Sequence, residues 1–281
     1  MDVAIASCRE LPEPDTDSAP LLAAMRTAGL DAEILAWDDP GADFSRARVT
    51  VIRSTWNYPE APAAFATWID RTARKTRLFN PAATVRWNLH KGYLLSLAKA
   101  GLSVVPTRLV EKGSAVPLSD VMRELAAADV VVKPAVSAGS RKTLRVTDPR
   151  AGEAHLAGLV AIEDALVQPY LPSVEGYGER SIIWIDGEFT HAIRKSRRLQ
   201  GDAESVDGPM PIAAEEADLA RRAVLAAPGP LLYARVDMAR SASGDPMLME
   251  LELIEPSLFF GRSAVALERY VRGVAGRAKA R

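Results

Sequence analysis

The chain has 281 residues, which exceeds one typical domain and allows a large core divided between two or three lobes. Its 35 Lys and Arg residues nearly balance its 36 Asp and Glu residues, so no overall charge indicates binding to nucleic acid or a membrane surface. The single cysteine, Cys8, excludes an intramolecular disulfide, and no apolar run reaches the length of a membrane span. Because the first ten residues also lack a basic leader, we expect a cytoplasmic protein that binds neither nucleic acid nor a membrane.

The first elements alternate between strand and helix. Residues 3–6 form a short apolar run that predicts a strand, and a helix capped by Asp17 or Ser18 follows and ends at Gly29. Two further runs, AEILAW and VTVIRST, also predict strands, and a helix over 61–75 closes the lobe. This alternation is typical of a small parallel α/β lobe, in which ligands bind beyond the carboxyl ends of the strands.

The end of the third predicted strand is rich in hydrogen-bonding side chains, namely Arg53, Ser54, Thr55 and Asn57. Together they supply donors that suit a small carboxylate or amide ligand. We therefore predict that these four residues contact the substrate. The alternative is a polar loop with Trp56 and Tyr58 packed beneath it.

The middle of the chain predicts a helix over 89–100, a strand over 103–110, a helix over 121–128 and a strand over 129–136. The loop that follows, SAGSRKT, carries Ser140 between a glycine and two cations. Backbone amides exposed by glycine, with Lys and Arg nearby, suit a polyphosphate, although a plain hairpin turn has the same composition. The loop lacks the spacing of a P-loop and of a dinucleotide fingerprint, so the sequence supports neither of those folds.

The last part begins with a predicted strand, ALVQPYL, and a hairpin in GERSIIWIDGEFTHAIRKS that turns at Asp186-Gly187. The charged, glycine-rich segment 197–211 is expected to be a mobile loop. An amphipathic helix over 213–227, a second hairpin over 231–255 and a terminal helix over 263–281 complete the chain.

The second hairpin carries acidic side chains within apolar strands. Glu250 and Glu252 are two apart and therefore point to the same face, and Asp237 lies in the preceding strand. The other face of the second strand is predicted to carry Met249, Leu251 and Leu253. Three converging carboxylates would form an oxygen cage for Mg²⁺, which usually shares its remaining sites with nucleotide phosphates. The alternative is a wet face on which the glutamates are solvated.

The order of these parts resembles the ATP-grasp superfamily from about Trp87 to Phe260, and the first lobe resembles the smaller domain that usually precedes it. The resemblance implies an α/β plus α+β protein with the ATP-grasp fold and an N-terminal small parallel α/β lobe. We expect three domains: 1–86 on the substrate side, 87–166 as the central lobe, and 167–281 as the C-terminal lobe with the metal site.

The resemblance also implies the roles of individual residues. In NLHKGYLL and VVVKPAV, Lys91 and Lys133 correspond to the two lysines that contact the nucleotide, although the first could be a solvated helix residue and the second a strand-end cation. The hinge that contacts adenine resembles Gln168-Pro169-Tyr170-Leu171, and Glu179 fits the acid that holds the ribose. The cations expected to face phosphate or substrate are Arg194, Lys195 and Arg235.

The metal ligands depart from the pattern of the family. The second strand commonly carries Glu-x-Asn, whereas this chain has Glu250-Leu251-Glu252, followed by Glu255 before Pro256. A register that starts at Glu252 would place Ile254 at a ligand position, which cannot bind metal. We therefore predict Mg²⁺ at Asp237, Glu250 and Glu252, with Glu255 as an anchor for a substrate amino group.

The residues RSTWNY, VVKPAVSAGS and ELELIEP are similar to the glutathione-synthetase and RimK-like ligases, and more closely to the O-ureido-serine cyclo-ligases of cycloserine biosynthesis. The resemblance implies an ATP-dependent carboxylate–amine ligase that activates a small amino-acid-like substrate as an acyl phosphate, with ATP and Mg²⁺ as cofactors. We expect a monomer or a homodimer. A kinase that releases its phosphorylated product and a non-catalytic nucleotide-binding protein remain alternatives. The three histidines are scattered, so a hydrolase with a side-chain nucleophile gains no support.

Overall fold

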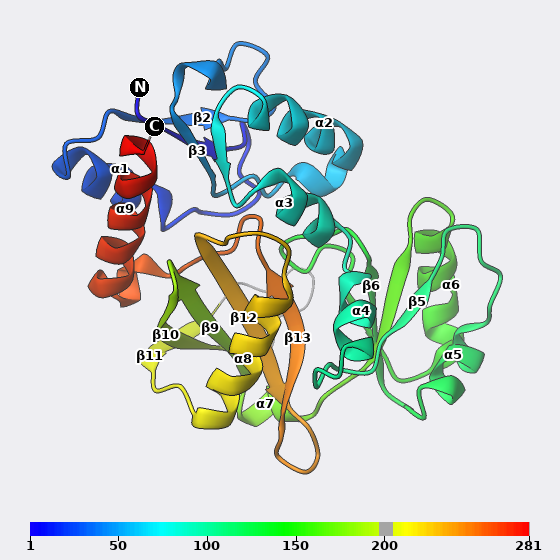
Figure 1. The fold of residues 1–281 in the computed structure, drawn as a ribbon. Helices are drawn as coiled ribbons and strands as arrows, with labels where there is room; N and C mark the ends of the chain where they lie inside the picture. The colour runs from blue at the N-terminus through cyan, green and yellow to red at the C-terminus, as the bar shows by residue number, and fades with distance from the viewer. Residues whose placement is uncertain (197–204, 281) are drawn as a thin grey trace.

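The computed structural model describes residues 1–196 and 205–280, and its backbone forms three sheets with helices on their faces (Figure 1). The first sheet is parallel and has the strand order β2-β1-β3-β4. Its strands are β1 (Val3–Ser7), β2 (Ala32–Ala36), β3 (Val49–Ile52) and β4 (Arg77–Phe79). The predicted N-terminal parallel lobe is therefore confirmed.

Helices cover both faces of this first sheet, and alternate residues of β1 serve the two faces. Val3 and Ile5 pack with one pair of helices, while Ala4 and Ala6 pack with the other. Because both faces are covered, β1 is buried throughout and reads as a continuous apolar run. The first pair is α1 (Ser18–Thr27) and α9 (Ala264–Lys279), and the second is α2 (Pro62–Ala73) and α3 (Ala82–Leu89). The last helix of the chain thus packs beside the first (Figure 1).

The second sheet is antiparallel and has the strand order β5-β8-β6-β7. Its strands are β5 (Arg108–Val110), β6 (Val130–Pro134), β7 (Leu144–Val146) and β8 (Ala165–Pro169). Alternate valines of β6 are buried against α5 (Leu118–Glu124) and α6 (Pro149–Val160). Strand β7 and helix α6 were not predicted, although Asp148 before Pro149 is a clear helix start, and its side chain accepts a hydrogen bond from the Arg150 amide.

The helix predicted over 89–100 is wrong in its first turn. Helix α3 ends at Leu89, and α4 (Tyr93–Lys99) begins only after a short turn. His90 is extended in this turn, and the Lys91 amide donates to the carbonyl of Ala135, 2.8 Å away, instead of to a helical carbonyl. Contacts with the second sheet therefore override the local helical pattern.

The third sheet is antiparallel and has the strand order β11-β10-β9-β12-β13. Its strands are β9 (Glu179–Ile185), β10 (Glu188–Lys195), β11 (Val206–Met210), β12 (Tyr233–Arg240) and β13 (Pro246–Glu252). Both predicted hairpins are confirmed, and Asp186 and Gly187 turn the first with φ of 45° and 95°. Helix α8 (Ala214–Ala226) packs on one face, and the short α7 (Ser173–Gly176) precedes β9.

The mobile loop predicted over 197–211 is wrong where the chain is described, because residues 206–210 form β11 at the edge of the sheet. The remainder of that prediction, 197–204, lies outside the described residues. Within residues 1–196 and 205–280 there are also three single 3-10 turns: Phe44–Arg46, Tyr58–Glu60 and Phe260–Arg262.

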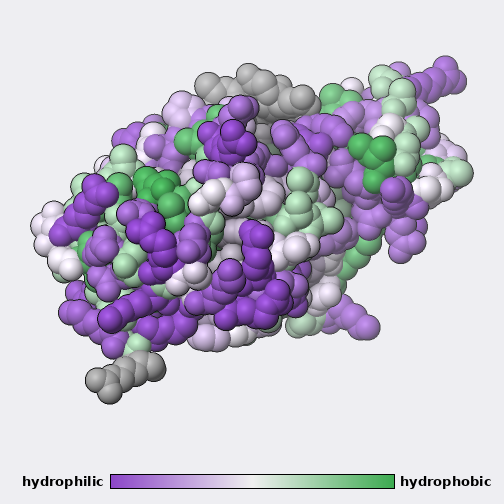
Figure 2. Space-filling view, turned by 90° about the horizontal axis from the view of Figure 1, so that it is seen from above, coloured by the Kyte–Doolittle hydropathy of each residue, from purple (hydrophilic) through white to green (hydrophobic). Residues whose placement is uncertain are grey.

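The face of the molecule seen in Figure 2 is mostly polar. Figure 2 shows hydrophilic residues over most of the face seen from above, with apolar residues in separate small groups. Leu225 and Val265 are the most exposed of the large apolar side chains described, and single exposed apolar residues are normal for a protein surface. Among the described helices, none has the length and apolar composition that crossing a membrane requires.

Candidate active site

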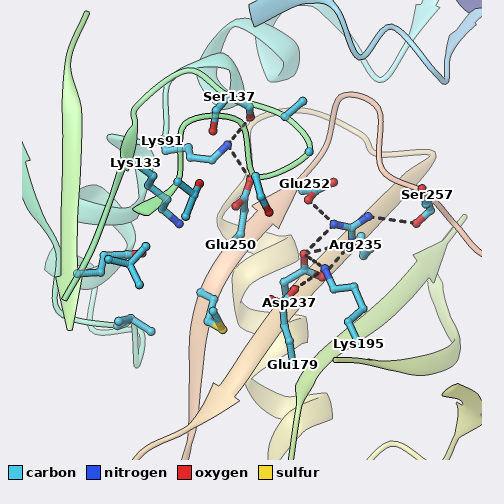
Figure 3. Close-up of a pocket in the computed structure, with 18 of the residues that line it drawn as sticks. Lys91, Lys133, Ser137, Glu179, Lys195, Arg235, Asp237, Glu250, Glu252 and Ser257 are labelled. Carbon is cyan, nitrogen blue, oxygen red and sulfur yellow. Dashed lines mark hydrogen bonds and ion pairs between the residues drawn. The ribbon is translucent and has the colours of Figure 1, made fainter. Parts of the chain in front are cut away.

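A pocket lies between the second and third sheets, and the first lobe contributes to its rim. It brings together most of the predicted site residues: Lys91, Lys133, Ser140, Gln168, Tyr170, Glu179, Lys195, Arg235, Asp237, Glu250, Glu252 and Glu255. Figure 3 shows the charged members of this set pointing toward one another from several elements. Residues that lie far apart in the sequence, such as Lys91 and Glu250, therefore form one site only through the tertiary fold.

Lys91 reaches the pocket from the turn between α3 and α4. Its ammonium donates to the Ser137 carbonyl at 2.6 Å and lies 2.8 Å from the Glu250 carboxylate. The neighbouring His90 contacts Asp164 at 3.1 Å, and the Gly92 amide donates to the other nitrogen of the His90 ring. These contacts fix the turn and so aim Lys91 at the hairpin acids.

Lys133 enters the pocket from β6, and its situation differs from that of Lys91. Its side chain makes no hydrogen bond or ion pair with any residue that the structure describes. Burial, reinforced by the charge of Lys91 and opposed by Glu250, lowers the pKa of Lys133. A buried cation without a close acid is suited to an anionic ligand, and Figure 3 shows this side chain directed into the pocket.

The acids of the hairpin occupy adjacent strands and face the pocket together. Asp237 of β12 lies directly opposite Glu250 of β13, and Arg235 lies opposite Glu252. Arg235 binds Asp237 with two nearly parallel hydrogen bonds of 2.9 and 2.8 Å and also bonds Glu252. Lys195 contacts Asp237 at 3.1 Å and pairs with another acid of the pocket, Glu179.

Side chains of the preceding helices hold the outer edge of β13. Asn88 donates to the Leu251 carbonyl at 2.7 Å and accepts from the Leu253 amide, while the Tyr93 hydroxyl bonds the Leu251 backbone. An edge strand otherwise presents unpaired backbone groups. These bonds replace the missing neighbouring strand and fix the face that carries Glu250 and Glu252.

The predicted alternation along β13 is correct for the two leucines and wrong for Met249. Leu251 and Leu253 are buried in the core against α8, as expected. The register passes from Glu250 opposite Asp237 to Leu248 opposite Met238, so Met249 is an extra residue in a β-bulge. The bulge turns Met249 into the pocket, where it packs with Tyr170 and Val174.

The electrostatics of the pocket are unbalanced because one arginine serves two carboxylates. Although burial opposes it, the charge of Arg235 and then that of Lys195 hold the pKa of Asp237 well below its usual range. Burial raises the pKa of Glu252 to about 8 against the opposing charge of Arg235, and Asp237 adds to this rise. Glu250 is the reverse case, since Lys91 and Lys133 outweigh its burial and lower its pKa. The pocket therefore disfavours the charged form of Glu252 and favours the charged forms of Asp237 and Glu250.

The predicted Mg²⁺ ligands are carboxylates, which Mg²⁺ prefers, but in this structure they form ion pairs with Lys and Arg side chains. Among the described residues, no three His, Cys, Asp or Glu side chains are arranged to hold a metal ion directly. Asp237, Glu250 and Glu252 nevertheless offer hard oxygen donors on one face, and a bound cation would offset the burial that raises the pKa of Glu252. The donor set therefore suits Mg²⁺ once the cations gain other partners.

The apolar end of the pocket lies near the predicted hinge. Val131, Tyr170, Leu171, Val174 and Met249 form a small apolar cluster there. The Tyr170 amide donates to the Asp129 carbonyl, and the Arg145 guanidinium lies 3.5 Å from the centre of the Tyr170 ring. The Gln168 amide group donates to the Thr107 hydroxyl at 2.8 Å. The glycine loop borders the same pocket through Ser140 and Gly139, both with positive φ.

The opposite end of the pocket is formed by the residues around Glu255. Burial raises the pKa of Glu255 to about 7, against the opposing charge of Lys91, and Tyr58 shares a hydrogen bond with its carboxyl group. The Trp56 indole donates to the Glu255 carbonyl at 2.9 Å. Ser257 lines the same end. These aromatic and acidic groups suit a small ligand with a cationic group.

Four predicted substrate residues do not line the pocket, contrary to the prediction. Arg53, Ser54 and Thr55 are almost completely buried within the first lobe, and the Ser54 hydroxyl bonds that of Ser7. Asn57 binds Asp38 and the Trp37 indole, 2.7 Å from each. These side chains tie the strand ends to one another. The two aromatic residues expected beneath the loop, Trp56 and Tyr58, face the pocket instead.

Arg194 also lies away from the pocket. It is opposite Asp207 of β11 and forms an ion pair with that carboxylate. Adjacent residues of a strand point to opposite faces, so Arg194 and Lys195 could not both reach the site. The signal for this outcome was present in the sequence.

Several pocket residues were missed from the sequence. Glu13, Ser137, Ser257 and Met249 line the pocket, and of these only Ser137, the first residue of the SAGSRKT loop, belongs to a motif with a chemical signature. Tyr58 and Trp56 were visible in WNYP, and their aromatic character at the end of a strand was the usable signal.

The chain closely resembles proteins of one biosynthetic family over nearly its full length. Residues 3–80 match the family described as the D-cycloserine synthetase DcsG, N-terminal domain. The cycloserine biosynthesis protein DcsG of Streptomyces lavendulae is 37% identical over 284 residues, which cover 94% of this chain and 95% of that protein. The crystal structure of D-cycloserine synthetase DcsG superposes with a TM-score of 0.89 at 34% identity, covering 99% of this chain and 100% of that one.

A more distant likeness shows the shared fold alone. The ATP-grasp ligase PsnB, in a complex with its minimal precursor, Mg and ADP, superposes with a TM-score of 0.66 at 18% identity, covering 99% of this chain and 97% of that one.

Proposed function

The chain belongs to the ATP-grasp ligase family of D-cycloserine synthetase DcsG, and from this membership we propose that it closes the ring of O-ureido-serine by forming a C–N bond at the expense of ATP. The observation that carries this proposal is the convergence, in one pocket, of Lys91, Lys133 and Arg235 with three strand-borne carboxylates. Such a set suits phosphoryl transfer, which needs positioning and charge neutralisation more than covalent chemistry.

The nucleotide is proposed to lie between the second and third sheets. Its base would pack in the apolar cluster of Tyr170, Val174 and Met249, and its phosphates would extend toward Lys133 and the glycine loop. Because PsnB shares the fold and is described with Mg and ADP, we assign Mg²⁺ to Asp237, Glu250 and Glu252. When bound, Mg²⁺ supplies positive charge that offsets the phosphate oxygens during transfer.

The cations are proposed to exchange partners when ATP binds. Lys91, Lys195 and Arg235 now neutralise hairpin acids at distances near 3 Å. Phosphate oxygens offer them alternative partners of higher charge, which releases the carboxylates for the metal. The same cations then face the phosphoryl group as the substrate carboxylate attacks it, and ADP leaves.

The second step joins nitrogen to the activated carboxyl carbon. A nitrogen of the ureido group attacks that carbon, the bond from the carbon to the phosphate oxygen breaks, and inorganic phosphate and a proton are released. No side-chain nucleophile is needed. Glu255 is placed to hold the substrate ammonium group, whose charge would counter the burial that raises the pKa of this carboxyl group. Tyr58 and Trp56 would enclose the substrate from the first lobe.

Product analysis tests this proposal. The purified protein is incubated with ATP, Mg²⁺ and O-ureido-serine, and the release of ADP, phosphate and the cyclised product is followed by mass spectrometry. We expect all three from the one carboxylate substrate, with no second amine added. A phosphorylated product without free phosphate would indicate a kinase, and an absence of ADP would indicate a binding protein.

A matched pair of variants controls for indirect effects. Asp237→Asn removes a carboxylate from the pocket face of the hairpin, whereas Asp245→Asn changes an exposed residue in the turn of the same hairpin. We expect product formation to be lost in the first and retained in the second. Equal activity of the two variants would contradict the proposed site.

A further inference from the structure

The loop over 254–260 connects the metal-binding hairpin to the last helix and borders the substrate end of the pocket. Glu255 and Ser257 on this loop line the pocket, while Leu258, Phe259 and Phe260 are buried behind it. The loop itself has no partner strand, so its shape must come from other contacts.

One buried carboxylate holds the backbone of this loop. Asp17, which is 2% exposed, accepts hydrogen bonds from three consecutive amides: those of Leu258 at 2.6 Å, Phe259 at 3.0 Å and Phe260 at 2.8 Å. Asp17 stands at the N-cap of helix α1, one of the two cap positions predicted (Asp17 or Ser18), but its side chain makes no capping hydrogen bond. Asp15 accepts from the amides of Asp17 and Ser18 instead. The Asp17 carboxylate is thus committed to the loop, more than 240 residues away in the sequence.

The conformation of the loop explains why an anion is needed there. Phe259 has φ of 53° and ψ of 46°, in the left-handed region that a bulky side chain rarely adopts. This conformation turns successive amides toward one point and creates a concave site for an anion. A strained residue of this kind persists only where the surroundings hold it. Asp17 is the anion that does so.

Arg53 completes the contact from the neighbouring strand end. Its guanidinium is 2% exposed, donates to the Pro256 carbonyl at 2.7 Å and lies 3.5 Å from the Asp17 carboxylate. Arg53 therefore fixes the Pro256 carbonyl, and Asp17 fixes the three amides that follow it. Together the two side chains define the path of the chain from Pro256 to Phe260.

The loop transmits this arrangement to the phosphate end of the pocket as well. The Ser257 carbonyl lies 3.5 Å from the Arg235 guanidinium, and the Phe259 ring lies beneath the same guanidinium, 5.9 Å from its central carbon. Arg235 in turn binds two hairpin acids (Figure 3). A shift of the loop would therefore move the Glu255 end of the pocket directly and Arg235 only through a long contact.

We propose that Asp17 and Arg53 are positioning residues that set the substrate end of the site by clamping the loop over 254–260. This inference rests on the proposed function, since it assigns the amino-acid substrate to that end of the pocket. It separates two groups of residues: the clamp acts on the amino-acid substrate, and the lysines from the second sheet act on ATP.

The first experiment needs no substrate and so stands apart from the proposed function. Hydrogen exchange of the segment containing residues 257–260 is measured by mass spectrometry in the parent and in Asp17→Asn. We expect exchange of this segment to rise about tenfold or more in the variant, because the neutral amide is a weaker acceptor for three donors. The control is Leu156→Ala, which opens a cavity in the core of the second sheet, a cluster that contains no residue of the loop. Unchanged exchange in folded Asp17→Asn would overturn the clamp.

The second experiment measures steady-state kinetics with O-ureido-serine and ATP. For Asp17→Asn we expect the KM of the amino-acid substrate to rise about tenfold, while the KM of ATP stays within about twofold of the parent value. Equal changes in both constants, as in a merely destabilised protein such as Leu156→Ala, would contradict a positioning role. If Asp17→Asn does not fold, Arg53→Lys is measured instead, and the same split between the two constants is required. Absence of turnover in the parent would refute the proposed function, and hydrogen exchange would still decide the clamp.

Discussion

Replacing Lys133 separates binding from stability more sharply than any other change in the pocket. The side chain makes no hydrogen bond or ion pair with a described residue, and burial lowers its pKa below that of lysine in water. The folded state therefore disfavours the charged form that the unfolded chain carries at neutral pH. In Lys133→Met the charge is removed, but the length and apolar stem are kept. We expect this variant to be as stable as the parent or more stable.

The loss in ATP affinity can be worked from the single contact removed. A hydrogen bond between a charged donor and a charged acceptor contributes about 1.5–3 kcal/mol. The dissociation constant of ATP should therefore rise about 10- to 150-fold in Lys133→Met. Adenosine has no phosphate to lose this partner, so its affinity should stay within about twofold. We expect weaker binding of ATP together with unchanged binding of adenosine only if Lys133 faces the phosphates.

Lys91→Met is the matched control because it removes a lysine that is already paired. The Lys91 ammonium lies 2.8 Å from Glu250, whose side chain is 23% exposed. Removing one member of a buried ion pair costs about 3–5 kcal/mol, and the partial exposure of Glu250 places the expected loss at the lower end. Urea unfolding and calorimetric titration with ATP and adenosine measure both quantities. Unchanged ATP affinity in Lys133→Met, or a loss of stability equal to that of Lys91→Met, would refute this reasoning.

Three further changes test other parts of the structure. Glu250→Gln should retain the fold, as measured by circular dichroism, yet lose at least about 100-fold in turnover because it removes a charged oxygen from the proposed metal face. Near-normal turnover would contradict the assignment of Glu250 as a Mg²⁺ ligand. Burial lowers the pKa of His191 to about 4, so the stability of the parent relative to His191→Gln should fall by about 1–2 kcal/mol between pH 7 and pH 5 in urea unfolding. Gly187→Ala should cost about 1 kcal/mol in the same assay, because the turn requires φ of 95°. No loss would count against the observed turn.

Most of the strands and both hairpins could be predicted because their signals are local. The alternation of apolar residues placed Glu250 and Glu252 on one face, and the Asp186-Gly187 dipeptide supplied the positive φ values that the turn needs. The order of these parts was sufficient to indicate the ATP-grasp fold. Periodicity and turn chemistry thus specify much of the architecture.

The errors arise where distant contacts decide the local structure. The helix is interrupted at Lys91 because its amide bonds a carbonyl of the second sheet, and the bulge at Met249 depends on the register with the neighbouring strand. Arg53 faces inward because its partners, Asp17 and the Pro256 carbonyl, come from the two ends of the chain. A donor-rich strand end therefore indicated polar contacts correctly, but it did not distinguish a ligand from the protein's own backbone.

The central claim is that the carboxylate of O-ureido-serine is activated as an acyl phosphate and then attacked by an internal nitrogen. The most direct test labels both oxygens of that carboxylate with ¹⁸O and analyses the products by mass spectrometry. Transfer of the phosphoryl group to the carboxylate predicts inorganic phosphate with one labelled oxygen and a cyclised product with the other. Unlabelled phosphate during productive turnover, or label found in AMP, would contradict the account.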